Sequence, residues 1–181
     1  MVRLRRLLLL RCALVLASLI GVAAPAASVA GAPAAEFHVI WDGLLATSQV
    51  PADDSQWQGL RGNGVNTIVS LDDRMVDVGR YGFESFLWVP LGARAVPTER
   101  EAERFLKFIQ RRDNQPVHIS SAARDGRATM VALLRYAIDG WTMEHALADG
   151  QRLNGGAALS PQHVTWLRAW AASHPPGSHR R

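Results

Sequence analysis

Apolar and polar residues alternate along this chain in blocks that predict strands followed by helices. Apolar runs at 37–41 and 44–47 flank the turn Asp42-Gly43, a pattern typical of a β-hairpin. Further strands are predicted at 65–71, 86–90 and 116–120, where β-branched or apolar runs lie between turn residues. The last of these strands is followed by a loop rich in Ser, Ala and Arg that opens a helix.

Helix start signals lie between the predicted strands. Asp53 can cap a short helix that carries Trp57 and Leu60 and ends at 62–64. Thr98 and Glu101 form a capping box, followed by Phe105, Leu106 and Ile109 at helical spacing. Three more helices are expected: one through Met130 and Ile138 that stops at Gly140, one capped by Thr142, and one that starts at Ser160-Pro161.

This alternation predicts an α/β fold with a mostly parallel central sheet flanked by helices on both faces. Ligands of such sheets bind beyond the carboxyl ends of the strands. The loop after Ser120 lies at one such end, and a strand, a small-residue loop and a helix together form the usual topology of a phosphate site.

The first 35 residues have the features of a secretory signal peptide. Basic residues precede an apolar run from Leu7 to Val22, which Arg11 interrupts, and small residues follow it. We therefore expect export to the periplasm or secretion, with a membrane anchor only if the leader is not cleaved, and no stable membrane insertion after processing. We expect the remainder to comprise one domain at 36–174 and a disordered tail at 175–181.

The charge and the cysteine and histidine content of the chain bear on which ligands and partners we expect. The chain has 20 Lys and Arg against 16 Asp and Glu, and the leader's four arginines account for the whole excess. The domain thus has no net excess of basic residues, so we expect no nucleic-acid partner. Separately, we expect the protein to be a monomer. Cys12, the one cysteine, lies in the leader. The histidines show no compact ligand spacing, so no metal site and no cofactor are expected.

Several segments in order resemble one enzyme family. They are Gly43-Leu44-Leu45-Ala46-Thr47-Ser48-Gln49-Val50-Pro51, Gly64-Val65-Asn66-Thr67-Ile68-Val69-Ser70-Leu71, Pro97-Thr98, Pro116-Val117-His118, Thr129-Met130-Val131-Ala132-Leu133, and Gly140-Trp141-Thr142 with Ala146-Leu147. From about Gly43 to Leu153 the chain resembles the protein tyrosine phosphatase superfamily, in particular its compact dual-specificity branch in bacteria. The resemblance implies a phosphatase-like fold.

The resemblance also implies a chemistry that this chain lacks. The family uses a Cys thiolate as nucleophile, an Arg that binds the phosphoryl oxygens, and an Asp that protonates the leaving oxygen. Three registers remain open for the nucleophile: Ile119, Ser120 with Gly126, or Ser121 with Arg127. None restores a thiol, and residues 91–96, where the family carries its acid, contain no carboxylate.

Anion binding can survive the loss of the thiol, because loop amides and a helix N-terminus attract phosphate whatever the side chains are. The predicted phosphate-binding loop is Ser120, Ser121, Ala122, Ala123, Arg124, Asp125, Gly126 and Arg127. Arg124 and Arg127 can add charge-assisted hydrogen bonds, or can be solvated surface residues. Ser120 and Ser121 are more simply explained as local hydrogen-bonding groups, and His118 as a structural residue at a strand end.

Three hypotheses follow. The first is an exported pseudophosphatase that binds a phosphate ester or a phosphoprotein without hydrolysing it. The second is a working phosphoric monoester hydrolase in which Ser120 or His118 is the catalytic group. The third is an envelope interaction domain with no small ligand. Ligand-dependent stability separates the first from the third, and steady phosphate release identifies the second.

Overall fold

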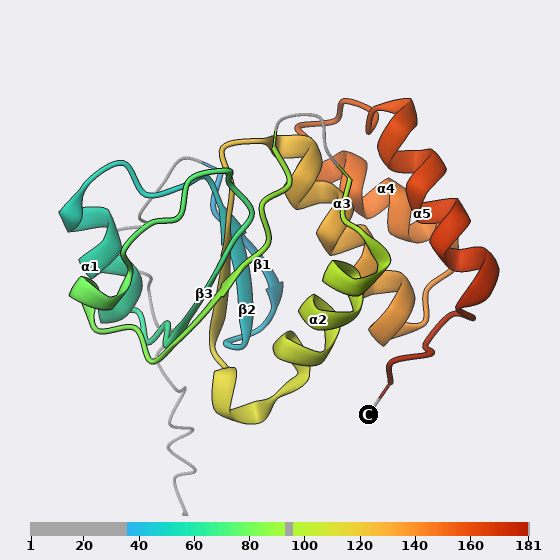
Figure 1. The fold of residues 1–181 in the computed structure, drawn as a ribbon. Coiled ribbons are helices and arrows are strands. Elements are labelled where there is room, and N and C mark those ends of the chain that lie inside the picture. Colours follow the sequence, from blue (N-terminus) through green and yellow to red (C-terminus); the bar gives the residue numbers. More distant parts are fainter. Residues whose placement is uncertain (1–35, 93–95, 181) are drawn as a thin grey trace, which may run out of the picture.

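The computed structural model describes residues 36–92 and 96–180 (Figure 1). The predicted leader with Cys12, and residues 93–95 of the segment where the family carries its acid, lie outside the described residues. Within the described ranges, no helix combines the length and the apolar character needed to cross a membrane.

A five-stranded sheet in the order β1-β2-β5-β3-β4 forms the centre of the molecule. The strands are β1 (His38–Trp41), β2 (Leu45–Ser48), β3 (Thr67–Ser70), β4 (Ser85–Trp88) and β5 (Val117–Ser120). The predicted hairpin is confirmed: β1 and β2 pair antiparallel, and the other neighbours pair parallel. The sheet is thus mostly parallel, as the alternation of strands and helices predicted.

The helices that follow β2 and β4 begin at the capping residues expected from the sequence. In α1 (Asp54–Gly62) the side chain of Asp53 accepts from the amide of Gln56. In α2 (Glu99–Gln110) the hydroxyl of Thr98 accepts from the amide of Glu101, whose carboxylate accepts from the amide of Thr98. This is the predicted capping box.

The chain after β5 is mainly helical. Helix α3 (Arg124–Leu134) continues into a π-helical turn (Arg135–Asp139) that ends at Gly140, whose φ of 74° is the left-handed conformation that glycine adopts readily. Helix α4 (Met143–Leu153) is capped by Thr142, as expected. Helix α5 (Pro161–Ser173) has proline in its first turn, but the side chain of Ser160 makes no capping hydrogen bond.

Helices cover both faces of the sheet, which confirms the predicted layers (Figure 1). Successive residues of a strand point to opposite faces of the sheet, so β5 presents side chains to both faces. Val117 and Ile119 belong to the larger core, formed with α2, α3, α4 and α5. On the other face, Ile68 packs with Trp57 and Leu60 of α1 in the smaller core. His118 and Ser120 point to this second face.

The segment after α5 contacts the domain. The amides of Gly177 and His179 donate to the carbonyls of Tyr136 and Ala137, and the side-chain amide of Gln110 donates to the carbonyl of His179. The structure therefore places against the π-helical turn a segment that we expected to be disordered. The sequence signal, Pro175-Pro176-Gly177, marked a turn rather than an unattached end.

Candidate functional site

The candidate site lies where β5 passes into α3, at the carboxyl end of the sheet. Ser120 is the last residue of β5 and pairs in register with Ser48 of β2 and Ser70 of β3. Only Ser121, Ala122 and Ala123 separate it from α3, and Ala123 provides no side-chain cap for that helix. An uncapped helix N-terminus leaves its first amides free to bind an anion.

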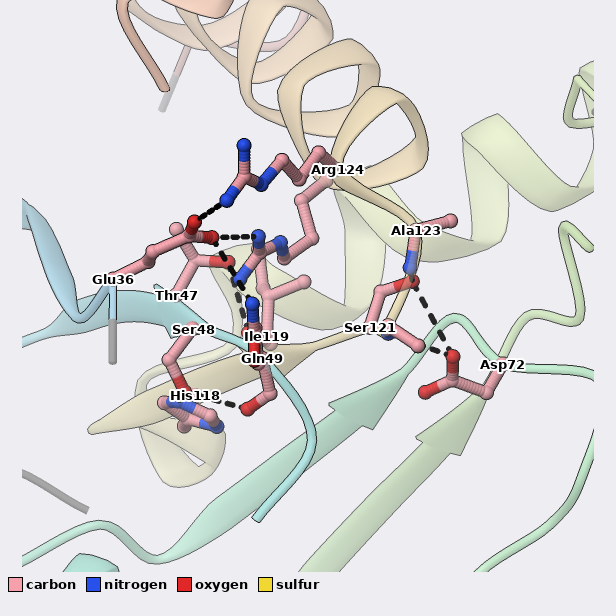
Figure 2. A network of polar contacts seen from close by, with 12 residues as sticks. Glu36, Thr47, Ser48, Gln49, Asp72, His118, Ile119, Ser121, Ala123 and Arg124 are labelled. Carbon is pink, nitrogen blue, oxygen red and sulfur yellow. Dashed lines mark hydrogen bonds and ion pairs between the residues drawn. The ribbon is translucent and has the colours of Figure 1, made fainter. Parts of the chain in front are cut away.

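The amides of this loop already have acceptors within the chain. The amide of Ala122 donates to Oδ1 of Asp72 at 2.9 Å, and the amide of Ala123 donates to Oγ of Ser121 at 3.1 Å. The hydroxyl of Ser121 lies 3.5 Å from the same Asp72 oxygen (Figure 2). The loop amides thus do not converge on one open point: Asp72, beyond the carboxyl end of β3, accepts from Ala122, and the hydroxyl of Ser121 accepts from Ala123.

Asp72, the acceptor of the Ala122 amide, has a partly buried carboxylate. Burial raises the pKa of Asp72, and the hydrogen bond from Ala122 and the positive charge of Arg127 offset only part of this effect. Its second oxygen, Oδ2, is buried without a hydrogen-bond partner in the described part of the chain. Asp72 was not predicted as a site residue, although its position beyond the carboxyl end of β3 is where ligand-binding residues gather.

The two arginines of the loop meet one carboxylate. Arg124 forms an ion pair with Oε1 of Glu36, and Nη2 of Arg127 lies 3.0 Å from Oε2 (Figure 2). Nε2 of Gln49 donates to Oε2 at 3.4 Å. Burial alone would raise the pKa of Glu36, but the hydrogen bond from Arg127 and the charge of Arg124 lower it. Glu36, which directly follows the predicted leader, was not among the site residues predicted from the sequence.

Arg127 differs from Arg124 in its surroundings. The side chain of Arg124 is 51% exposed, whereas that of Arg127 is 3% exposed. Nη1 of Arg127 is buried and has no partner among the described residues. A buried cation with an unused donor costs free energy unless an acceptor meets it. The alternative prediction, that both arginines are solvated surface residues, is therefore wrong for Arg127.

His118 and Ser48 form a second polar pair, on the face of the sheet that α1 covers. Nε2 of His118 lies 2.9 Å from Oγ of Ser48, and that hydroxyl also donates to the carbonyl of Gln49 at 2.8 Å. Since the serine's one proton is used, we assign the proton of this contact to Nε2. Burial, with a smaller contribution from the charge of Arg127, lowers the pKa of His118 to about 3. The ring is neutral at pH 7.

Neither predicted catalytic group has the partners that nucleophilic catalysis needs. Ser120 is 1% exposed and its Oγ has no hydrogen-bond partner within the described ranges. The unprotonated Nδ1 of His118 is also buried without a partner. No Ser120–His118 hydrogen bond joins them, so the geometry does not favour the hydrolase hypothesis.

The remaining predicted loop residues are structural. Asp125 accepts from Nδ2 of Asn154 at 2.7 Å and from the amide of Ser160 at 3.3 Å, which ties α3 to the start of α5. Gly126 faces Leu91 of the core.

The structure bears on the three registers proposed for the nucleophile. Only the pair Ser121 and Arg127 has both members in the polar network of the loop, whereas Ile119 lies in the larger core. Residues 36–92 and 96–180 contain no cluster of His, Cys, Asp or Glu that could bind a metal.

Comparison with known proteins identifies the fold. No family model and no curated protein matches the chain. Solved structures do: Tk-PTP in its active form is 21% identical, with a TM-score of 0.63 over 76% of this chain and 97% of that one. The catalytic core of the PP-IP phosphatase SIW14 from S. cerevisiae, in complex with citrate, is 12% identical, with a TM-score of 0.65 over 78% and 88%.

Another neighbour carries the same architecture. PTPMT1 in complex with PI(5)P is 19% identical, with a TM-score of 0.58 over 75% of this chain and 94% of that one. All these sequence identities are low, so the matches indicate a shared fold and not a shared activity. The resemblance seen in the sequence is confirmed at that level: the chain has the fold of the protein tyrosine phosphatase superfamily.

Proposed function

We propose that this chain is a phosphatase-like protein that binds a phosphate ester, on a small molecule or on a phosphoprotein, without hydrolysing it. The observation that carries the proposal is Arg127, a buried cation one turn inside α3 with an unused donor at Nη1. Side chains of a helix tilt toward its N-terminus, so the guanidinium belongs to the same end as the uncapped amides. Two arginines and a helix N-terminus favour a phosphate group.

Loss of hydrolysis follows from the groups at the same place. The described residues contain no cysteine, and a serine hydroxyl replaces a thiolate poorly unless a base removes its proton. The neutral His118 bonds Ser48, not Ser120. The hydroxyl of Ser121 is the one serine oxygen of the loop near a carboxylate, that of Asp72. Variants of Ser121 and Asp72 are therefore the strictest test of residual turnover.

The ligand panel follows from the neighbours. Because one neighbour is a PP-IP phosphatase and another binds PI(5)P, inositol phosphates belong beside phenyl phosphate, orthophosphate and vanadate. A ligand that binds only the folded state raises apparent stability by RT ln(1 + [L]/Kd), about 2.7 kcal/mol at a hundredfold excess over Kd. We expect a dose-dependent rise in Tm for at least one ligand, and no release of phosphate from phenyl phosphate.

Two results would decide against this proposal. Phosphate release in proportion to protein concentration, lost in Ser121→Ala or Ser120→Ala, would indicate a working hydrolase. An unchanged Tm with every anion at millimolar concentration would leave the interaction domain as the better account.

Export is part of the same proposal. The order of basic residues, apolar run and small residues at 1–35 supports a cleaved leader. Mass spectrometry of protein recovered from the envelope or the medium should find a mature chain that begins close to Glu36. Full-length chain retained in the cytoplasm would contradict export and leave the binding proposal intact.

A further inference from the structure

The carboxylate of Glu36 occupies the place where an anionic ligand would meet the two arginines. It bonds Arg124 through Oε1, and Arg127 and Gln49 through Oε2 (Figure 2). Three donors, two from the first turns of α3 and one from Gln49 after β2, thus converge on one carboxylate. Its backbone has a φ of 68°, a left-handed conformation that is uncommon outside glycine, asparagine and aspartate. The contacts that hold the side chain also offset this backbone cost.

The charges in this group do not balance. Arg124 and Arg127 are permanent cations, and Glu36 supplies one negative charge. Nη1 of Arg127 remains without an acceptor in the described structure. A phosphate monoester, which carries close to two charges above pH 7 and has three terminal oxygens, can match both arginines and offers an acceptor for Nη1. A monoanion can only replace one single charge by another.

Glu36 can give way to such a ligand. Its side chain is 25% exposed, so the site is reachable from solvent. As part of the same chain it competes with free ligands at an effective concentration of roughly millimolar or more. A free monoanion must overcome that competition with no gain in charge, whereas a dianion gains one further charge interaction with the arginines.

We propose that Glu36 is an internal competitor that makes the site selective for phosphate monoester dianions over monoanions. This inference rests on the proposed function, because it assigns the ligand class of the same site. In the unliganded protein Glu36 fills the arginine pair. A dianion displaces it, and a phosphodiester or a carboxylate does not.

The test compares wild type, Glu36→Gln and Asp42→Asn as full-length chains at pH 8. Asp42 is an exposed acid of the β1–β2 turn, so its variant controls for net charge. Isothermal titration calorimetry measures phenyl phosphate, a dianion, and dimethyl phosphate, a monoanion. In Glu36→Gln we expect phenyl phosphate to bind roughly tenfold more tightly, because the competitor is gone. Dimethyl phosphate should bind this variant measurably and the wild type not at all; Asp42→Asn should behave as wild type.

The outcomes separate this inference from the proposed function. If wild type binds phenyl phosphate and Glu36→Gln binds both anions no differently, Glu36 is only a structural ion pair and the inference is wrong, while anion binding stands. If neither protein binds either anion, both are wrong. Glu36→Ala repeats the test without the amide of glutamine, and circular dichroism verifies that each variant is folded.

Discussion

Two polar groups flank the junction of β5 and α3, and they differ in charge and in access to solvent. On the face covered by α1, Ser48, His118 and Ser120 are buried and neutral. At the N-terminus of α3, Glu36, Arg124 and Arg127 are charged, and solvent reaches Glu36 and Arg124. From the sequence, Ser120 and His118 of the first group were the catalytic candidates. The charged donors on which the proposed anion site depends belong to the second group.

The difference shows that nucleophilic catalysis and anion binding make different demands on the groups of a phosphatase-like fold. Nucleophilic chemistry needs an accessible atom with a base beside it, and burial has removed both from Ser120 and His118. Anion binding needs only donors and positive charge, which the helix and the arginines supply. In this chain two carboxylates already meet donors of this region: Asp72 accepts from the amide of Ala122, and Glu36 pairs with Arg124 and Arg127.

Removal of the buried cation should have the largest effect on binding. Arg127→Met deletes the donor that has no other acceptor, and we expect the affinity for phenyl phosphate to fall about a hundredfold, since hydrogen bonds to charged groups contribute roughly 1.5–3 kcal/mol. Arg124→Gln should cost several-fold less, because its side chain is 51% exposed and screened by water. Calorimetry on both variants measures the two values.

Arg168→Gln is the control for this comparison, since Arg168 is an exposed arginine of α5. It should bind as wild type does. Equal losses for all three variants would mean that only net charge attracts the ligand, and that the arginine pair is not a site.

The neutral state of buried His118 should make the free energy of unfolding depend on pH. The folded-state pKa of His118 is about 3, against about 6.5 for an unfolded chain, so below pH 6.5 the unfolded state binds a proton that the folded state excludes. Stability is therefore lost as the pH falls from about 6.5 toward 3, by up to about 1.4 kcal/mol per pH unit from this residue. Urea unfolding of wild type and His118→Gln between pH 7 and pH 4.5 measures that slope.

Other groups titrate in the same range, so the informative quantity is the difference between the two proteins. His118→Gln should show the shallower slope. Parallel slopes would show that His118 is protonated in the folded state and would reopen its role as a base.

Asp72 follows β3 and accepts from the loop amide of Ala122, and its variants should separate its charge from its hydrogen bond. Asp72→Ala removes the acceptor of the Ala122 amide and should lower the free energy of unfolding by about 1 kcal/mol. Asp72→Asn keeps an acceptor and removes the buried charge. Because burial raises the pKa of Asp72, the charged form destabilises the fold at neutral pH, and Asp72→Asn should equal or exceed wild type there and lose this advantage below about pH 4.

Thermal unfolding at pH 7 and pH 3.5 checks both variants. Asp72→Asn as unstable as Asp72→Ala at pH 7 would show that the carboxylate itself stabilises the loop.

The smallest effect is expected at the serine hydroxyls. Oγ of Ser120 and Oγ of Ser70 are buried without partners in the described structure, and their residues are neighbours across β5 and β3. Ser120→Ala and Ser70→Ala each remove an unsatisfied polar group and should leave stability unchanged or raise it by up to about 1 kcal/mol. Ser48→Ala, which deletes the partner of His118, is the contrasting variant and should destabilise. A loss above 1 kcal/mol in Ser120→Ala would reveal a partner for that hydroxyl.

The fold was largely predictable because its signals are local. The capping box of Thr98 and Glu101, the cap at Asp53 and the β-branched run before Asp72 each specify an element through contacts with their own neighbours. The alternation of these elements then predicts the mostly parallel sheet. The segment after His174 is the exception, because its order depends on contacts with the distant π-helical turn.

The site was less predictable because its partners are distant in sequence. Glu36 and Arg127 are 91 positions apart, and Asp72 and Ala122 are 50 apart. No spacing rule brings such residues together before the sheet order is known. Burial, which distinguishes Arg127 from Arg124 and neutralises His118, is likewise a property of the assembled layers and not of the loop sequence.

The most direct test of the central claim measures binding and turnover in one sample. Wild-type chain is titrated with phenyl phosphate in a calorimeter, and the same solution is assayed for free phosphate. We predict saturable binding that Arg127→Met weakens about a hundredfold, with no phosphate above the level of that variant. Phosphate release that scales with wild-type protein and is absent in Ser121→Ala, or no binding by the wild type, would contradict it.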